Sequence, residues 1–382
     1  MRIRRMNTMV GTQRCSFEPC RDGPQRPPIP GAHGGAPLHY FSFCSYQYAI
    51  RYALWALLSM RKGGFRKMFK YQVTQKVCNI GGVKVGGQLG ENPPLLIGNM
   101  FQKGDLILED RKGGKFNRKV AEERIHELEN ISRETGVPCL VAMVANSEEE
   151  VKGYIDFFTS VTEMPFAIDI WQQKTRLAAA RYIAKRGLQG RALYNSITPW
   201  DEDINAQVSE LRELGIKHVV IQVFDMEDKK PTGRVKSLKN LLPLVEKGNF
   251  ESILVDTAVM NLPATTFSLL ANHLIKKEFG FPVGFAPSNG TYMWRKAAGE
   301  QGKEKFPGID AGVHAISALF SDFLFYGPLT GTIRVFPAVA AASSMMAALA
   351  FDESNLLPTG NHPLNLLFPE VVKQFQKEKG EK

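Results

Sequence analysis

The chain has 382 residues, of which 44% are hydrophobic and 23% are charged, a composition typical of a globular protein with an ample core. Its formal net charge of +10 lies mostly in residues 1–67, which hold 11 Lys and Arg against two acidic residues and leave 37 basic against 36 acidic residues in the remainder. A nearly neutral body lacks the clustered positive charge of a nucleic-acid surface, so we exclude nucleic-acid binding.

Residues 1–67 differ in composition from the rest and form a separate segment. Residues 19–37 are rich in Pro, Gly and Arg and are predicted not to fold. The apolar residues 46–60 are fewer than the about 20 that a transmembrane helix needs, are interrupted by Arg51, and lack the cleavage site of a signal peptide. We expect a disordered or spurious leader, no transmembrane segment, and a native start at Met68. The alternatives are a regulatory or membrane-associating arm, which would suit a peripheral place on a membrane complex, and an artificial tail.

The cysteines give no disulfide framework. Three of the five lie in the leader, and Cys78 and Cys139 remain in apolar surroundings of the body. Two thiols in so long a segment favour a reducing compartment, so we expect a cytoplasmic protein.

From about residue 73 the pattern becomes regular. A Gly-rich stretch, VCNIGGVKVGGQLGENPP, is typical of a hairpin. Eight strand-like apolar runs then alternate with helical patterns. The runs are residues 95–100, 138–144, 165–170, 192–197, 218–224, 252–259, 281–286 and 322–327. The helical patterns are centred on residues 121–131, 151–161, 174–186, 204–214, 238–245, 267–275, 314–319 and 336–350.

These runs are continuously apolar, as expected for strands whose two faces are both buried in a parallel sheet. Eight strand–helix units predict an α/β fold, a (β/α)8 TIM-type barrel over residues 68–382, preceded by the hairpin and the leader. An open sheet of six or seven strands is the alternative, but the GxGxxG run that usually follows its first strand is absent from the sequence.

Polar side chains stand at the ends of four of these runs. Asp169, Asn195 and Asp256 end the third, fourth and sixth runs, and Asn289 follows the seventh. Function in such barrels lies at the carboxyl ends of the strands, although Asp and Asn also occur there for local capping reasons. A carboxylate can accept two parallel hydrogen bonds from a 2-amino-4-oxo-pyrimidine, and an Asn amide can donate and accept at once. The set predicts a site for a flat, polar heterocycle.

Six runs carry a resemblance to a known family: GGVKVGGQLGENPP, YIDFFTSVTEMPFAID, RALYNSI, LVDTAV, FPVGFAPSN and FYGPLTGTIRVFPAVA. The stretch that holds them, from about residue 69 to residue 351, resembles the MtrH subunit of tetrahydromethanopterin S-methyltransferase and bacterial relatives that use methyltetrahydrofolate. The resemblance implies a methyltransferase of one-carbon metabolism or methanogenesis. It would move a methyl group between N5 of a reduced pterin (tetrahydromethanopterin or tetrahydrofolate) and the cobalt of a corrinoid, and it would form a homodimer.

The resemblance also assigns roles to residues. Asp169, Asn195 and Asp256 would bind the pterin ring, and Asn289 would contact N5 as the catalytic residue. Asn99 takes the first-strand position, where GNMFQ replaces the Glu-Arg-Ile-Asn run of the folate enzymes. Because no Asp-x-His-x-x-Gly run is present, we expect the cobalamin or other corrinoid to be carried by a partner protein.

We expect no bound metal, because the body has just two distant cysteines and zinc-dependent methyl transfer needs thiolates at ligand spacing. The histidines of the predicted helices and strands are interpreted as packing or surface residues: His126, His218, His273 and His314.

Two other functions stay open. In GPLTGTIRVF, the residues Gly327, Thr330, Gly331 and Thr332 suit a phosphate site of a barrel lyase or isomerase, or alternatively a tight turn. A non-catalytic subunit of a methyltransferase complex is the other alternative. The sequence leaves undecided the choice between folate and methanopterin, the corrinoid partner, the final methyl acceptor and the direction of transfer.

Overall fold

A computed structural model of the chain describes residues 70–110 and 114–380, which belong to one compact unit, Arg66–Lys382. The expectations for residues 1–67 concern a segment outside these ranges.

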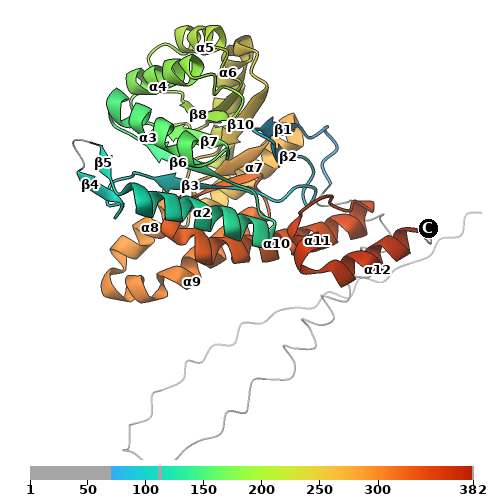
Figure 1. Cartoon of the computed structure of the whole chain (residues 1–382). Helices are drawn as coiled ribbons and strands as arrows, with labels where there is room; N and C mark the ends of the chain where they lie inside the picture. The colour runs from blue at the N-terminus through green and yellow to red at the C-terminus, as the bar shows by residue number, and fades with distance from the viewer. Residues whose placement is uncertain (1–69, 111–113, 381–382) are drawn as a thin grey trace, which may run out of the picture. The chain divides into compact units, whose positions relative to one another are not determined.

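Eight parallel strands close into a barrel in chain order, and the last strand pairs with the first. All eight runs expected from the sequence form strands, so the TIM-type barrel is confirmed and the open sheet is wrong (Figure 1). The strands are β3 (Leu95–Met100), β6 (Cys139–Val144), β7 (Phe166–Asp169), β8 (Ala192–Ile197), β9 (His218–Gln222), β10 (Ser252–Asp256), β11 (Val283–Phe285) and β12 (Phe323–Pro328).

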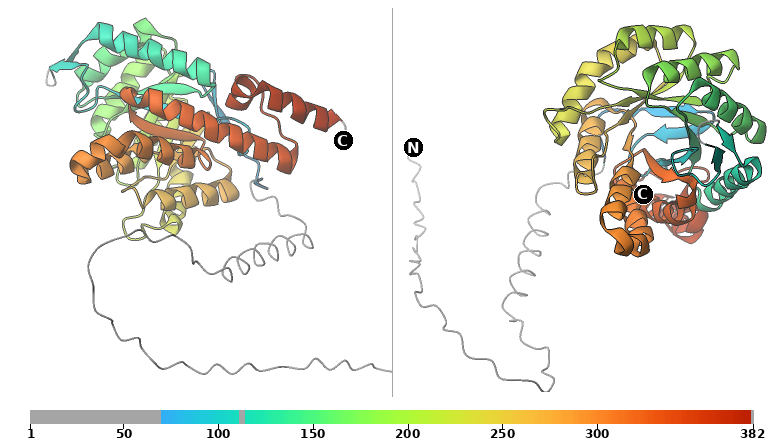
Figure 2. Two further views of the ribbon diagram at one scale, coloured as in Figure 1. Left: turned by 90° about the horizontal axis from the view of Figure 1, so that it is seen from below. Right: turned by 90° about the vertical axis from the view of Figure 1, so that its left-hand side faces the viewer.

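Helices form a ring around the strands, as the right-hand view of Figure 2 shows. They are α2 (Arg118–Thr135), α3 (Glu148–Val161), α4 (Gln173–Lys185), α5 (Ile204–Glu213), α6 (Pro231–Val245), α7 (Thr265–Phe279), α8 (Pro287–Ala297), α9 (Gly299–Ala318) and α10 (Thr332–Ser354). Between β11 and β12 the sequence predicts one helical region, and the structure has two helices, α8 and α9. The chain continues through α11 (Pro363–Leu367) and α12 (Pro369–Gly380), which the sequence pattern did not predict.

The barrel strands bury both faces. One set of side chains fills the barrel interior, including Ile97, Ala167 and Leu254. The alternate set, including Ile168 and Val255, packs against the helices. This double burial is the reason that the strands are continuously apolar in sequence.

A hairpin closes the amino-terminal end of the barrel. Strands β1 (Val77–Ile80) and β2 (Val83–Gly86) pair antiparallel, as the sequence predicts. Ile80 and Val85 pack into the interior cluster of the barrel, and Gly81 N donates to Gly190 O just before β8. A second small hairpin, β4 (Leu108–Asp110) and β5 (Lys115–Phe116), lies at the opposite end (Figure 1). A ligand therefore has access to the barrel from its carboxyl-terminal end.

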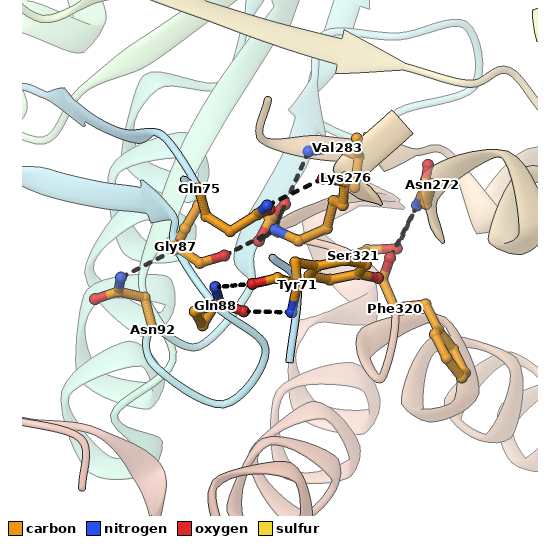
Figure 3. A network of polar contacts seen from close by, with 12 residues as sticks. Tyr71, Gln75, Gly87, Gln88, Asn92, Asn272, Lys276, Val283, Phe320 and Ser321 are labelled. Atoms are coloured by element: carbon orange, nitrogen blue, oxygen red, sulfur yellow. Dashed lines mark hydrogen bonds and ion pairs between the residues drawn. The ribbon is translucent and has the colours of Figure 1, made fainter. Parts of the chain in front are cut away.

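A buried ion pair fastens the β1–β2 hairpin to the barrel (Figure 3). Lys276 Nζ on α7 donates to Asp322 Oδ1 and Oδ2, at 2.8 and 2.7 Å, and to Gly87 O at 2.9 Å. Val283 N donates to Asp322 Oδ2 at 2.9 Å. Because both charges are buried and hydrogen-bonded, the removal of one partner would leave an uncompensated charge at this end of the barrel.

Within the described residues, one helical segment is long and apolar enough to cross a membrane by length and composition. It is Leu329–Ser354, with a mean hydropathy of 1.6, and 56% of its most apolar window is buried. The segment includes α10, which packs against α2 and α9 in the helix ring. This burial accounts for its apolar composition.

Candidate functional site

A cavity of about 860 Å³ opens at the carboxyl-terminal mouth of the barrel, within the range of small-molecule sites. Residues at or after the ends of all eight strands line it. Its wall is therefore built where barrel enzymes carry their active sites.

Side-chain alternation in the strands places a polar layer on the floor of this cavity. In each of five strands, a polar residue follows an interior apolar residue by two positions, so the pleat directs it inward. The pairs are Ile97 and Asn99, Ala167 and Asp169, Leu193 and Asn195, Val220 and Gln222, and Leu254 and Asp256. Some of these polar residues are register partners on neighbouring strands. Asp169 pairs with Asn195 in β7–β8, and Gln222 pairs with Asp256 in β9–β10.

Asp169 is held by two amides. Asn99 Nδ2 donates to Asp169 Oδ2 at 2.7 Å, and Asn195 Nδ2 donates to Asp169 Oδ1 at 3.2 Å. Burial raises the pKa of the Asp169 carboxyl, and the two amide donors oppose that rise. These contacts link β3, β7 and β8 and fix three of the predicted residues relative to one another.

The Asp256 carboxylate accepts fewer hydrogen bonds than that of Asp169. Its side chain is 6% exposed, and Oδ1 accepts a hydrogen bond from Ala258 N at 2.7 Å. Within the described part of the chain, Oδ2 has no hydrogen-bond partner. Burial raises the pKa of Asp256 to about 7, and the negative charge of Asp169 adds to the rise.

Asn289 reaches the cavity from a helix. Strand β11 ends at Phe285, Pro287 takes the first position of α8, and Asn289 lies in the first turn of that helix. Ser288 Oγ donates to Phe325 O at 2.9 Å and so attaches this turn to β12. The Asn289 side chain is exposed at the cavity wall and makes no hydrogen bond to any described residue.

The structure thus brings all five predicted residues to one cavity, and it adds a sixth, Gln222. Its amide also makes no hydrogen bond to described residues. The sequence carried the signal for Gln222, because HVVIQ ends in a polar residue after an apolar run, as FAID does.

Two exposed tryptophans stand at the rim. Trp171 follows β7 and Trp200 follows β8; they are 80% and 44% exposed, and their ring centroids are 6.1 Å apart. Buried Arg176 holds both segments, because it donates to Asp201 Oδ1 and Oδ2 at 2.7 and 2.9 Å and to Ile170 O at 2.9 Å. The sequence does not predict either tryptophan as a site residue. The two are brought together by Arg176, which contacts loops that follow two different strands.

The histidines lie where the sequence interpretation placed them. His126 is exposed on α2, whereas His218 and His314 are buried in β9 and α9. Across residues 70–110 and 114–380, no group of three or more His, Cys, Asp or Glu side chains is arranged to hold a metal ion. Burial raises the pKa of the Cys139 thiol to about 12, which keeps it protonated and unreactive.

A family model and individual relatives place the chain in the same protein family. Residues 73–355 match the model of the tetrahydromethanopterin S-methyltransferase MtrH subunit. The chain is 33% identical over 314 residues to the H-type subunit of the putative methyltransferase mtx in Methanosarcina acetivorans, covering 78% of this chain and 100% of that protein. It is 30% identical over 315 residues to the H-type subunit of tetrahydromethanopterin S-methyltransferase in Methanopyrus kandleri, covering 77% and 97%.

The fold also recurs in a solved structure. Dihydropteroate synthase of Yersinia pestis, in a sulfonamide drug complex, superposes with a TM-score of 0.53 at 11% identity and covers 72% of this chain and 100% of that one. At that identity the likeness supports the barrel fold alone, while the family model and the relatives determine the family. The chain therefore belongs to the tetrahydromethanopterin S-methyltransferase MtrH subunit family, as its sequence motifs predicted.

Proposed function

We propose that this methyltransferase-family chain binds a reduced methyl-pterin in the mouth cavity and transfers the N5 methyl group to the cobalt of a corrinoid on a partner protein. The observation that carries the proposal is the polar floor of the cavity. Asp256 Oδ2, Gln222 and Asn289 offer hydrogen-bonding groups that no described residue uses. Relatives at 30% identity carry the name of a tetrahydromethanopterin S-methyltransferase subunit.

The donor set fits the amino-pyrimidinone edge of a pterin. That edge presents adjacent ring N–H and amino donors, and Asp256 has a free oxygen at the cavity floor. Asp169 accepts from two amides, and its oxygens retain further acceptor capacity. The Gln222 amide can donate to the ring carbonyl and accept from a ring N–H. A neutral or anionic ligand without such donors would leave Asp256 uncompensated.

The different burial of Asp256 and Asn289 suggests how the pterin ring would be oriented. Asp256 is buried, whereas Asn289 is exposed at the open edge of the same cavity. A pterin whose amino-pyrimidinone edge meets Asp256 would therefore present N5 to Asn289 at the mouth. When the methyl group leaves, N5 needs a proton or a strong hydrogen bond, because a neutral tertiary amine is a poor leaving group. The Asn289 amide supplies that hydrogen bond in either protonation state of N5.

The rim supports docking of a corrinoid-bearing partner. Leu106, Trp171, Trp200, Met226 and Met260 are exposed apolar side chains, each carried on a segment that follows a barrel strand. Trp171 and Trp200 lie side by side with ring centroids 6.1 Å apart, and exposed apolar surface of this kind suits contact with a partner. A bound corrinoid supplies the methyl-accepting cobalt, and its flat macrocycle suits an aromatic and methionine-rich rim. The partner's identity and the expected homodimer stay predictions, as does the cytoplasmic location.

Asn289→Ala tests the proposal. Loss of cobalt(I) absorbance is followed with free cob(I)alamin and with methyl-tetrahydromethanopterin or methyl-tetrahydrofolate in parallel. We expect turnover to fall on the order of 10²–10³-fold while pterin affinity changes far less, as for comparable transition-state hydrogen bonds. Asn205→Ala on the exposed face of α5 is the matched control. Unchanged turnover would reject the role of Asn289. Failure of the unmodified protein to bind either methyl-pterin in a calorimetric titration would reject the function.

The two alternatives differ from this proposal in what they bind. In the phosphate alternative the Thr332 hydroxyl would face a ligand, but it is buried and donates to Leu329 O at 2.6 Å. Gly327 and Thr330 do line the cavity, so a phosphate contact there would come from that turn. A non-catalytic subunit would have no use for the free polar groups of the floor. Titration with a reduced pterin and with a phosphosugar separates the three functions.

A further inference from the structure

The charged side chains of the cavity that form no ion pair with described residues are separated by sign. Its unpaired carboxylates, Asp169 and Asp256, come from β7 and β10. Lys103 follows β3 and Arg295 lies on α8 after β11, and in the closed barrel β11, β12 and β3 are consecutive neighbours. The two cations therefore lie on a different side of the mouth from these two carboxyl groups. Asp105, which also lines the cavity near Lys103, is neutralised by Arg124.

The cations on that side are available to a ligand. Among the described residues, neither Lys103 nor Arg295 forms an ion pair, whereas the third cation of the wall, Arg176, is paired with Asp201. The nearby Arg334 is also neutralised, because its Nε donates to buried Asp310 at 2.7 Å.

The Arg295 guanidinium is held by its aromatic surroundings. It lies 4.8 Å from the ring centroid of Phe306 and 5.8 Å from that of Tyr292. Cation–π contacts at these distances restrain the guanidinium, and none of its N–H groups donates to a described residue. A planar fork of donors at the wall of a cavity is suited to a carboxylate or a phosphate.

We propose that this side of the cavity, with Arg295 as its main contact and Lys103 as a second, binds the anionic tail of the pterin. The inference rests on the proposed function. In a pterin, the tail is attached to C6, the atom bonded to N5. Asn289 and Arg295 stand six residues apart on α8, roughly 9 Å along the helix axis. A ring with N5 at Asn289 would start its tail beside α8 and direct it along the helix toward Arg295.

The tail subsite is tested by calorimetric titration of the full chain with three ligands. Tetrahydromethanopterin and 5-methyltetrahydrofolate carry anionic tails, and 6-methyltetrahydropterin has the ring alone. For Arg295→Gln we expect affinity for both tailed pterins to fall about tenfold or more, the size of one lost charge-assisted contact, with little change for the ring alone. Arg295→Lys keeps the charge and retains part of the affinity.

Lys296→Gln is the matched control, because it removes the same charge from the adjacent position of α8 and leaves all three affinities unchanged. Thermal melting of each variant shows whether Arg295→Gln remains folded. Equal weakening of tailed and tail-free ligands, or no weakening at all, would overturn the subsite. If the unmodified protein binds the tail-free ring as tightly as the tailed pterins, the subsite fails and the proposed function stands. If it binds none of the three, both fail.

Discussion

Asp256→Asn tests whether the buried Asp256 carboxylate lowers the stability of the folded protein. Burial raises the pKa of Asp256 from its usual 3.8 to about 7 in the folded protein. Between these two values the folded chain holds a proton that the unfolded chain has lost, so the free energy of unfolding decreases as pH rises through this window. The difference of about three pH units corresponds to ~4 kcal/mol at most, at 1.36 kcal/mol per unit. Above pH 7 the loss is complete.

The substitution removes this titration and preserves the contact to Ala258 N, because an amide oxygen accepts the same hydrogen bond. We expect the variant to match the unmodified protein near pH 4 and to exceed it by up to ~4 kcal/mol at pH 8. Reversible urea unfolding, followed by tryptophan fluorescence at each pH, measures the difference. Pterin binding should weaken in the same variant, because an amide offers one acceptor in place of two.

Asp352→Asn, the same change on the exposed end of α10, is the matched control for the pH series. A stability difference between Asp256→Asn and the unmodified protein that stays constant from pH 4 to pH 8 would refute the assignment of the raised pKa. A variant that is less stable at pH 8 would show that the ionised carboxylate is compensated in the folded protein.

Two further substitutions remove a buried cation from opposite ends of the barrel. Lys276→Met leaves Asp322 unpaired at the amino-terminal end of the barrel. We expect the free energy of unfolding, measured in urea, to fall by about 3–5 kcal/mol with unchanged turnover per folded molecule. Reduced turnover would show that this end of the barrel affects the site. Arg176→Met leaves Asp201 unpaired at the mouth, and we expect a similar loss of stability. We also expect slower methyl transfer, because Trp171 O loses the hydrogen bond from Arg176 Nη1. Methyl transfer at the unmodified rate in a folded Arg176→Met variant would exclude a role for the rim.

The sequence predicted the barrel because a local signal determines it. A strand buried on both faces needs a continuous apolar run, and eight such runs alternating with helical periodicity leave few other folds. The floor of the site followed from the same regularity, since the last inward position of a strand is the first that reaches the cavity. Asp169, Asn195 and Asp256 occupy such positions. Gln222 also does, and its run HVVIQ ends in a polar residue in the same way as FAID.

Features that depend on contacts between distant segments were not predictable in this way. Trp171 and Trp200 meet because Arg176 binds the loops after two different strands. Arg295, which lines the cavity, lies 4.8 Å from the ring centroid of Phe306, a residue of the second helix, α9. No periodic pattern within one element encodes either arrangement, because each depends on the lengths of the intervening segments and on the closure of the barrel.

The two carboxylates of the floor show what the structure adds to the motif. FAID and ILVD end in the same residue type at the same inward position, and the sequence offers no reason to distinguish them. Asn99 and Asn195 donate to Asp169, whereas one backbone N–H is bonded to Asp256. The ionised form of Asp256 is therefore disfavoured while its second oxygen has no donor. A ligand with adjacent N–H groups would remove that energetic cost on binding. The site should therefore bind such a ligand more tightly than one without these donors.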